Sequence, residues 1–526
     1  MLHLKAAVES SSRPDLQDRL TGKFYTPEVL ARTLVSSAPD EFAPQSICDP
    51  FCGDGRLIVA WIRHLNERGT LRNLNRVHLV DLDREAVDEA AKAVKGVLAE
   101  NEAHSVQIFA DAVDAFDASE LATCDVVITN PPWEQLKPDS RDLVSESETY
   151  RSEIRAYSEG LAKKFEGSGS AQRRSVGGYT VNLARAGALL AASLVKEGGL
   201  LQIILPSTIF GDQVSTRFRE NFFQKLLVER LDFYPAEARL FKKVDQSIVT
   251  LVGRRGGPTR EFSLRRHGPD LQLSDERIHA IADAKEPLPL AVTGLQSEIV
   301  NFIRGMHPST SWLESDLRFG LRLGREVDET RISECFTDSP NGIPFVKGRN
   351  IQRFTANLED LPKLDPKKKK IPGSVFERRV VWRDVSRPSQ KRRVHSCIIP
   401  PNYVAGNSLG IARFASQSSN LPDTWMAILN SLVFEIQIRA ILSTNHVSQG
   451  AIRKCAVPYK LFEDEALRSK IAGLAKQPSI DQCIAMEVAV AKGYGLGRAD
   501  FEAILTAFNK FSEEEKCAYL KKEIWS

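Results

Sequence analysis

Short apolar runs alternate with amphipathic stretches between Pro44 and about Arg255. Apolar residues recur at helical spacing in three stretches: Arg56–Glu67, Arg84–Ala99 and Val181–Val195. Seven short runs have the composition of strands: Ser46–Asp49, Val77–Val80, Val106–Phe109, Val126–Thr129, Leu200–Leu205, Leu227–Phe233 and Ser247–Val252. This alternation predicts an α/β domain with a mainly parallel, seven-stranded sheet covered by helices on both faces. The last two strands lack a helix between them, and we expect them to pair antiparallel.

The alternation stops near Gly257, and the remaining residues follow other patterns. Residues 340–460 are rich in strand and turn signals, whereas the last stretch of the chain has helical periodicity. We therefore expect a domain over residues 1–257, an α+β domain over 258–460 and a helical segment over 461–526. Within the first domain, the polar stretch Asp139–Gly178 is expected to be a long loop over a site.

Composition bounds the classes of protein that the chain fits. No apolar run reaches the roughly 18–20 residues of a membrane helix, and the N-terminus lacks the layout of a secretory signal. Eight cysteines in 526 residues form no dense framework, so a reducing cytoplasm is the expected location. Cys48 and Cys52 have no second Cys/His pair at zinc spacing, so we expect no metal site.

A basic segment stands out against a net charge of only +3. Between Lys363 and Arg393 there are 12 Lys and Arg residues and 3 Asp and Glu residues, interleaved with aromatic and β-branched residues. Such a segment can neutralise phosphates, which favours nucleic-acid contact over a solvated loop. The candidate contacts there are Lys368, Arg378, Arg392 and Arg393, and outside the segment Arg453 and Lys454.

A glycine turn and two acids follow the first three predicted strands. Asp49, Pro50, Cys52, Gly53 and Gly55 belong to the turn DPFCGDG, which ends a strand and opens a helix. Glycines there let the backbone approach a ligand closely, and the helix N-terminus faces that ligand. Asp81 ends the second strand, where a carboxylate can accept ribose hydroxyls, and Asp111 follows the third, placed to meet an adenine amino group.

The most informative motif is Asn130-Pro131-Pro132-Trp133, directly after the strand Val126–Thr129. The Asn130 amide oxygen and the Pro131 carbonyl can accept hydrogen bonds from both N–H groups of an aromatic amino group. This localises the nitrogen lone pair for methyl transfer. Pro131 and Pro132 fix the backbone, so the carbonyl is held where charge develops. Trp133 offers a flat face on which an extruded base can stack. A strand-ending Asn-Pro turn is the alternative explanation of the motif.

In this order, the motifs resemble those of γ-group N6-adenine DNA methyltransferases of bacterial type II restriction–modification systems. Gly22–Glu28 fits the N-terminal motif of that family, and the resemblance covers residues 22–253. It implies a Rossmann-like fold with S-adenosylmethionine as cofactor. Tyr25, Thr26, the glycine turn, Asp81, Asp111 and Asn130 are then expected to border the cofactor. Phe241 resembles a second aromatic residue that packs against the flipped base.

The C-terminal half resembles target-recognition regions of such enzymes, including those with asymmetric sites. NGIPFVKGRNI at 341–351 contains Lys347 and Arg349, two more candidate DNA contacts, and NHVSQGAIRKCAVP spans 445–458. Double-stranded DNA and a separately encoded restriction endonuclease are the partners that the resemblance implies, because no nuclease motif is visible. The alternatives are an N4-cytosine methyltransferase, in which Ser or Asp usually replaces Asn130, a protein-glutamine or RNA methyltransferase, and a non-catalytic DNA-binding subunit.

Overall fold

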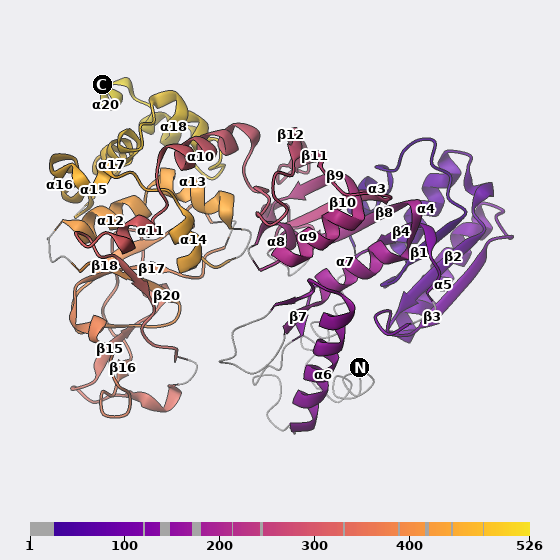
Figure 1. The fold of residues 1–526 in the computed structure, drawn as a ribbon, viewed down its shortest axis with the longest axis horizontal. Coiled ribbons are helices and arrows are strands. Elements are labelled where there is room, and N and C mark those ends of the chain that lie inside the picture. Colours follow the sequence, from indigo (N-terminus) through magenta and orange to yellow (C-terminus); the bar gives the residue numbers. More distant parts are fainter. Residues whose placement is uncertain are drawn as a thin grey trace. The chain divides into compact units, whose positions relative to one another are not determined.

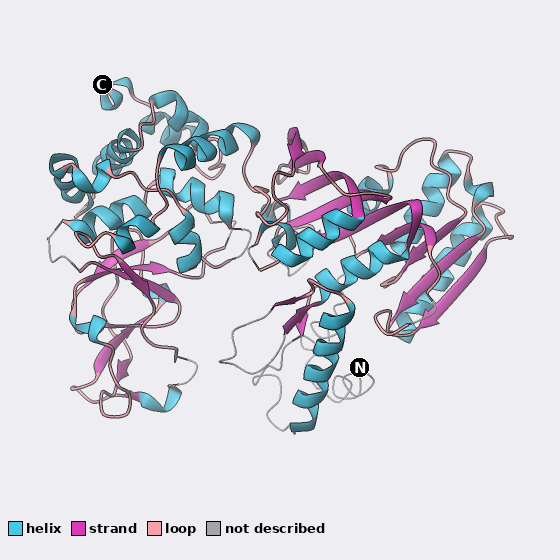
Figure 2. Ribbon diagram, viewed as in Figure 1, coloured by secondary structure: helices cyan, strands magenta, loops and turns pink. Residues whose placement is uncertain are grey.

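The computed structural model of the chain divides into two compact units, Met1–Leu288 and Pro289–Ser526. It describes residues 26–118, 121–136, 148–170, 180–212, 214–241, 246–329, 332–387, 390–415, 420–442, 445–476 and 478–526. Figure 1 follows the chain through both units, and Figure 2 shows that strands dominate the centre of the first unit, whereas helices dominate the second.

A nine-stranded sheet forms the first unit, in the order β12-β11-β9-β10-β8-β4-β1-β2-β3. The seven strands predicted from the sequence form one continuous block of it, from β9 to β3. Neighbours from β8 to β3 are parallel, and β10 pairs antiparallel with both β8 and β9, as expected. The strands are β1 (Ser46–Asp49), β2 (Arg76–Asp81), β3 (Gln107–Ala112), β4 (Cys124–Thr129), β8 (Val195–Pro206), β9 (Leu226–Tyr234), β10 (Ile248–Arg255), β11 (Glu261–His267) and β12 (Leu273–Ala280).

The helices of this unit bury apolar residues, α7 on almost every side and α4 along one stripe. In α4, for example, Leu57, Ile58, Trp61, Ile62 and Leu65 are buried, which is the spacing that predicted the helix. The helices are α3 (Glu28–Val35), α4 (Arg56–Glu67), α5 (Arg84–Glu100), α6 (Glu148–Lys164), α7 (Leu183–Leu194), α8 (Thr208–Gly211) and α9 (Thr216–Lys225). A small sheet of β5 (Gln135–Leu136), β7 (Thr180–Asn182) and β6 (Gly169–Ser170) lies apart from the large one.

Two expectations for the first unit need correction. The compact unit extends to Leu288 rather than to residue 257, because β11 pairs parallel with β9 and carries β12 with it. The stretch Asp139–Gly178 is not all loop, since it contains the 17-residue helix α6. Its polar sequence has little apolar periodicity, which is why the helix was not visible in the hydrophobic pattern.

The second unit combines two four-stranded sheets with a group of helices. The first sheet has the order β13-β20-β17-β18 and the second β14-β16-β15-β19. Their strands are β13 (Arg322–Gly324), β14 (Phe336–Thr337), β15 (Ile343–Val346), β16 (Lys363–Leu364), β17 (Arg379–Arg383), β18 (Ser396–Ile399), β19 (Val404–Ala405) and β20 (Leu409–Arg413). The helices are α10 (Gly294–Met306), α11 (Ser311–Ser315), α12 (Leu421–Leu429), α13 (Leu432–Ile441), α14 (Gln449–Lys454), α15 (Lys460–Glu463), α16 (Glu465–Ala475), α17 (Ile480–Gly493), α18 (Arg498–Leu505), α19 (Glu513–Tyr519) and α20 (Lys522–Trp525).

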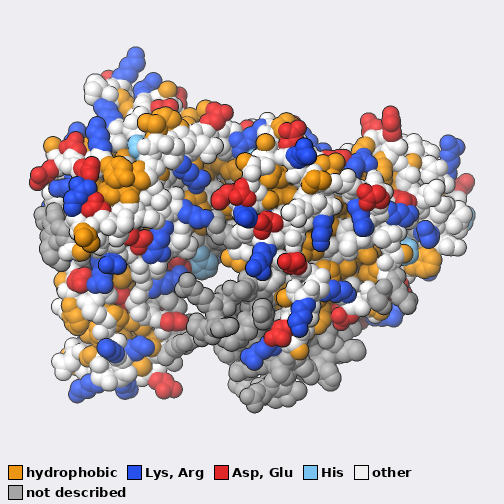
Figure 3. Space-filling view, in the orientation of Figure 1, with side chains coloured by type: hydrophobic (Ala, Val, Ile, Leu, Met, Phe, Trp, Pro, Cys, Tyr) orange, Lys and Arg blue, Asp and Glu red, His pale blue; other side chains and the backbone are white. Residues whose placement is uncertain are grey.

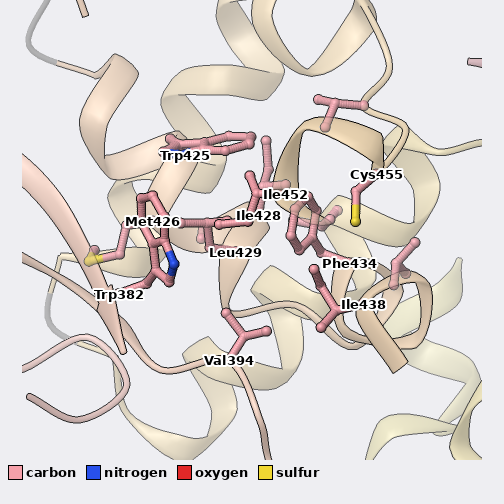
Figure 4. Packing of buried hydrophobic residues seen from close by; sticks show 14 of the residues in the cluster. Trp382, Val394, Trp425, Met426, Ile428, Leu429, Phe434, Ile438, Ile452 and Cys455 are labelled. Atoms are coloured by element: carbon pink, nitrogen blue, oxygen red, sulfur yellow. The ribbon is translucent and has the colours of Figure 1, made fainter. Parts of the chain in front are cut away.

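One hydrophobic core joins the sheet β13-β20-β17-β18 to the helices of this unit (Figure 4). Trp382 of β17 and Trp425 of α12 are fully buried in it. A Cβ atom at Gly410 would lie 2.1 Å from the Trp382 ring, so only glycine allows β20 to pair beside that indole. The α+β character of the C-terminal half is confirmed. Its helices, however, begin before residue 461, and the C-terminal helices share the same core rather than forming a separate segment.

Candidate active site

The glycine turn lies at the carboxyl end of β1, where the sequence placed it. Gly53 and Gly55 have positive φ angles of 49° and 77°. A side chain at Gly55 would also lie 2.9 Å from Ala90 of α5. Both positions therefore require glycine, for backbone conformation and for close packing respectively. The turn ends at Gly55, and α4 begins at Arg56.

Asp81 connects this turn to the end of β2. Its carboxylate accepts the Gly53 N–H at 3.0 Å and the Asp83 N–H at 3.0 Å. The Cys52 N–H also donates to the Val80 carbonyl at 2.8 Å. Burial raises the pKa of Asp81 above its ordinary value. The turn and the carboxylate predicted to serve one ligand are therefore held side by side.

Asp49 is a fully buried carboxyl group that joins β1 to β4. Its Oδ1 accepts a 2.6 Å hydrogen bond from the Thr129 hydroxyl and a 3.1 Å bond from the Phe51 N–H. Its Oδ2 is buried without a hydrogen-bond partner among the described residues. Removal from water raises the pKa of Asp49 to about 7. A buried oxygen of this kind beside a glycine turn fits a polar ligand group.

Asn130 follows β4 and contacts the N-terminal motif. Its Nδ2 donates to the Thr26 hydroxyl at 3.3 Å. The Thr26 carbonyl accepts a 2.7 Å bond from Arg56, which is also paired with Asp54 of the glycine turn at 2.5 Å. The structure thus brings together Thr26, the turn and Asn130. The sequence analysis missed Arg56, although its position as the first residue of the helix could have indicated it. Tyr25 lies outside the described residues.

Pro131 packs closely against α7. A Cβ atom at Gly187 would lie 2.4 Å from the Pro131 Cβ and 3.2 Å from the Phe51 ring. Pro131 is buried, and Pro132 is half-buried. The glycine therefore lets the helix support the Asn-Pro-Pro turn directly.

Trp133 and Phe241 meet, although 107 positions separate them in the chain. Their ring centroids are 4.9 Å apart, and the rings are tilted by 67° in an edge-to-face contact. Phe241 is 5% exposed and Trp133 is half-buried. The two aromatic residues predicted to hold a base are therefore in direct contact.

Asp111 is exposed in the edge strand β3, next to Val80 of β2 in register. The neighbouring acid Asp114 is better enclosed: its carboxylate accepts a 2.7 Å bond from the Tyr157 hydroxyl of α6. Burial raises the pKa of Asp114. The sequence gave no sign of this pair, because Tyr157 lies in the helix that the hydrophobic pattern did not reveal.

The candidate DNA contacts of the second unit differ in exposure. Arg349, Lys368 and Lys454 are exposed. Lys347 is half-buried and forms an ion pair with Glu329 at 2.8 Å. Arg378 is paired with Asp423 of α12 at 2.9 Å, and Arg453 with Glu314 of α11 at 2.7 Å. On the face shown in Figure 3, basic and acidic side chains are interspersed, as the small net charge suggests.

Arg392 and Arg393 are in a different environment from the one predicted. They are 5% and 2% exposed. Arg392 donates to Glu487 of α17 at 2.6 Å, and the Arg393 N–H donates to Glu435 of α13 at 2.8 Å. Arg392 forms buried ion pairs with Glu487 and Glu435, and the Arg393 guanidinium donates to the Leu442 and Ser386 carbonyls, so both residues join the β17–β18 connection to its surroundings. We correct this part of the prediction, because buried guanidinium groups are not accessible to phosphates.

Among the residues that the structure describes, no group of three or more His, Cys, Asp or Glu side chains could hold a metal ion. In the same part of the chain, no helix is long and apolar enough to cross a membrane. A nucleoside ligand that also carries polar groups fits this site. The glycine turn, the unsatisfied oxygen of Asp49 and the Asp81 carboxylate would face it.

Residues 15–161 match the family model described as N-6 DNA Methylase. Two solved structures share the fold over most of the chain. The type IIL restriction-modification enzyme MmeI in complex with DNA has a TM-score of 0.50 at 10% identity, over 99% of this chain and 76% of its own. The DrdV–DNA complex has a TM-score of 0.51 at 12% identity, over 91% of this chain and 60% of its own. No protein of curated function matches the chain in sequence. S-adenosylmethionine is the cofactor expected of such a site.

Proposed function

We propose that the chain is a site-specific DNA methyltransferase that modifies the N6 amino group of adenine, as the modification enzyme of a restriction–modification system. The observation that carries this proposal is the convergence of Asn130, Thr26 and the glycine turn, with Trp133 and Phe241 in contact nearby. The family match over residues 15–161 supports the same chemistry.

The proposed chemistry needs two acceptors and a stacking surface from the chain. Bound S-adenosylmethionine supplies an electrophilic methyl group. The Asn130 amide oxygen and the Pro131 carbonyl accept hydrogen bonds from the two N–H groups of the adenine amino group. The nitrogen lone pair is thereby turned toward the methyl carbon. The bond from Nδ2 to Thr26 orients the amide, and α7 supports Pro131 through Gly187. Acceptors held in place before the reaction stabilise the charge that develops on the amino group.

Base engagement is assigned to Trp133 and Phe241. An adenine inside a duplex cannot reach a site at the edge of this sheet, so it must rotate out of the stack at a cost of about a few kcal/mol. Stacking on an aromatic face offsets this cost. Phe241 fixes the orientation of the Trp133 ring through their edge-to-face contact.

DNA recognition is assigned to the second unit. Arg349, Lys368 and Lys454 are its exposed candidate contacts, and Lys347, Arg378 and Arg453 are each paired with a carboxylate. The DNA complexes of MmeI and DrdV, which share the fold, support this assignment. We further propose that cleavage is left to a separately encoded endonuclease.

Replacing Asn130 by Ala tests the proposal. Incorporation of methyl groups into DNA should fall by at least a hundredfold, while calorimetry should show nearly unchanged cofactor binding, because only the acceptor for the amino group is lost. Asn66→Ala, on the exposed face of α4, is the control and should keep full activity. Retained methylation by the Asn130 variant would contradict the mechanism.

The product distinguishes the alternatives. Chromatography of hydrolysed DNA should yield N6-methyladenine. N4-methylcytosine would replace the proposal by the cytosine-specific alternative, and the absence of calorimetric cofactor binding would favour a non-catalytic subunit.

A further inference from the structure

A buried carboxylate in the second unit holds two exposed basic side chains. Asp384 directly follows β17, and its side chain is 5% exposed. Its Oδ1 accepts a 2.9 Å bond from Arg325, which follows β13, and its Oδ2 accepts a 2.9 Å bond from His446, which precedes α14. The Arg325 side chain is 47% exposed and that of His446 60% exposed.

The backbone also fixes this cluster. The Val447 N–H donates to the Asp384 carbonyl at 2.6 Å, and the Ser386 N–H donates to the Asn445 carbonyl at 2.7 Å. Val385 and His446 form an antiparallel bridge. The segments that carry Asp384 and His446 are thus joined by main-chain bonds, and Arg325 directly follows β13, which pairs with β20.

The chemistry of the two side chains favours a ligand rich in acceptors. An arginine fork carries five N–H donors, so Arg325 can bridge Asp384 and an acceptor outside the protein. The hydrogen bond to Asp384 raises the pKa of His446 above its ordinary value, although burial and the nearby Arg325 charge act in the opposite direction. When the imidazole is protonated, both of its ring nitrogens are donors. An exposed pair of this kind contributes little to stability by itself.

The cluster adjoins a segment already assigned to DNA. The Ser408 carbonyl accepts the Asp384 N–H at 2.9 Å, and the Ser408 hydroxyl accepts the Gly348 N–H at 2.9 Å. Gly348 stands between Lys347 and Arg349 in the sequence, and Arg349 is exposed. Arg325 and His446 therefore extend a basic surface that the sequence motif had located only in part.

We propose that Arg325 and His446, oriented by Asp384, form a DNA-contact site that binds paired acceptors. This inference rests on the proposed function. It adds Arg325, which no motif indicated, and gives a role to His446 of the 445–458 motif and to Asp384 of the basic segment. The acceptors are either the O6 and N7 atoms of a guanine or the oxygens of a phosphate, since both suit an arginine fork beside an imidazole donor. Asp384 acts as a positioning residue.

Mapping of the methylated bases distinguishes a contact to guanine from a contact to phosphate. DNA from cells that express the wild type, Arg325→Ala or His446→Ala is sequenced at the single-molecule level. A contact to a base relaxes the methylated sequence at a defined position. A contact to phosphate keeps the sequence but weakens DNA binding about tenfold and reduces the salt slope by about one per residue. Either result supports the site.

Arg318→Ala is the matched control. Arg318 is also an exposed arginine, 62% exposed and paired with Asp316 and Glu463, but it lies before β13 rather than after it. This variant should match the wild type in both measurements. Asp384→Asn should cause at least the loss seen for Arg325→Ala, because Asp384 orients both Arg325 and His446. Adding Arg325→Ala to Asp384→Asn should lose little more, because that donor is already misplaced.

Two further measurements keep the outcome clear. Arg325→Lys retains the charge but not the fork, and should keep the fold while losing selectivity or affinity, which shows that any defect is not unfolding. If the wild type methylates no base, the proposed function fails, yet anisotropy titration with duplex DNA still tests the site. Equal affinity, salt slope and methylated sequence in wild type, Arg325→Ala and His446→Ala would overturn it.

Discussion

At the scale of single residues, the site depends on groups whose environment differs from bulk water. Asp49 is the clearest case, because its carboxyl is fully buried and its pKa is raised to about 7. Trp133 is the second, since it is held by Phe241 while its own side chain stays half-buried. Each makes a prediction that a single substitution tests.

Asp49 should make the cofactor-free protein less stable as pH rises. In the unfolded chain the carboxyl ionises near its ordinary pKa of about 3.9, whereas in the folded protein it stays protonated to about 7. The free energy of unfolding therefore falls between about pH 4 and pH 7, by on the order of 4 kcal/mol. Asp49→Asn should flatten this dependence in urea titrations. Asp88→Asn, on the exposed face of α5, should not.

Trp133→Ala should mainly weaken engagement of the flipped base. Loss of one stacking face costs about 1–3 kcal/mol, so fluorescence of 2-aminopurine at the target position should report flipping reduced by roughly tenfold, with cofactor binding unchanged. Trp133→Phe should restore much of the signal, because a flat ring returns to the contact with Phe241. Equal fluorescence in the Ala variant would assign the stacking to another residue.

At the scale of elements, the site is made by close approach between a helix and a turn. The helix α7 meets the Asn-Pro-Pro turn at Gly187, where there is no room for a Cβ atom. The hydrophobic pattern predicted the helix, but not which of its residues faces the turn. The geometry of the proposed acceptors, Asn130 and Pro131, is therefore a property of packing between elements.

Gly187→Ala should lower methylation while leaving the fold intact. The added methyl group must displace Pro131 or α7, which costs about 1–3 kcal/mol in a packed region, and the displaced carbonyl no longer meets the amino group well. Gly96→Ala is the control. Gly96 lies in α5 with no atom within 4 Å of its added Cβ, so the change should be neutral or stabilising by up to about 1 kcal/mol. Equal activity of the two variants would argue against the packing role.

At the scale of the whole molecule, the basic segment serves two purposes in the second unit. Arg392 lies in the core beside Glu487, whereas Lys368 of the same segment is exposed. Arg349, from the earlier motif, is exposed as well. Charge counted along the sequence treats these side chains alike, but burial separates structural arginines from those that can contact DNA.

Arg392→Ala should therefore lower the stability of the fold, whereas Arg349→Ala should weaken DNA binding. Removing Arg392 leaves the buried Glu487 carboxylate without its closest cation and should lower the free energy of unfolding by about 3–5 kcal/mol. Arg349→Ala should leave thermal unfolding unchanged while weakening DNA binding and lowering its salt slope by about one. Calorimetric unfolding and binding titrations measure the two effects separately. A stable Arg392 variant with weakened DNA binding would restore the original interpretation.

The sequence by itself determined the local features of this protein. Hydrophobic periodicity predicted three helices (α4, α5 and α7) and the seven core strands of the first unit, because an element that packs on a core must bury apolar residues. The motifs placed Asp49, Asp81 and Asn130 at strand ends, because each follows a short apolar run and only a few residue types suit the turn that comes next. These inferences need only neighbours along the chain.

Tertiary structure alone decided which distant residues meet. Several contacts join segments that lie between about 30 and 120 positions apart in the sequence. They are the contacts of Arg56 with Thr26, of Tyr157 with Asp114, of Asp384 with Arg325 and His446, and of the buried Arg392 with Glu487. The extension of the sheet by β11 and β12 is of the same kind. Charge and polarity do not reveal such contacts, because whether a side chain is paired, buried or exposed depends on what the rest of the chain packs against it.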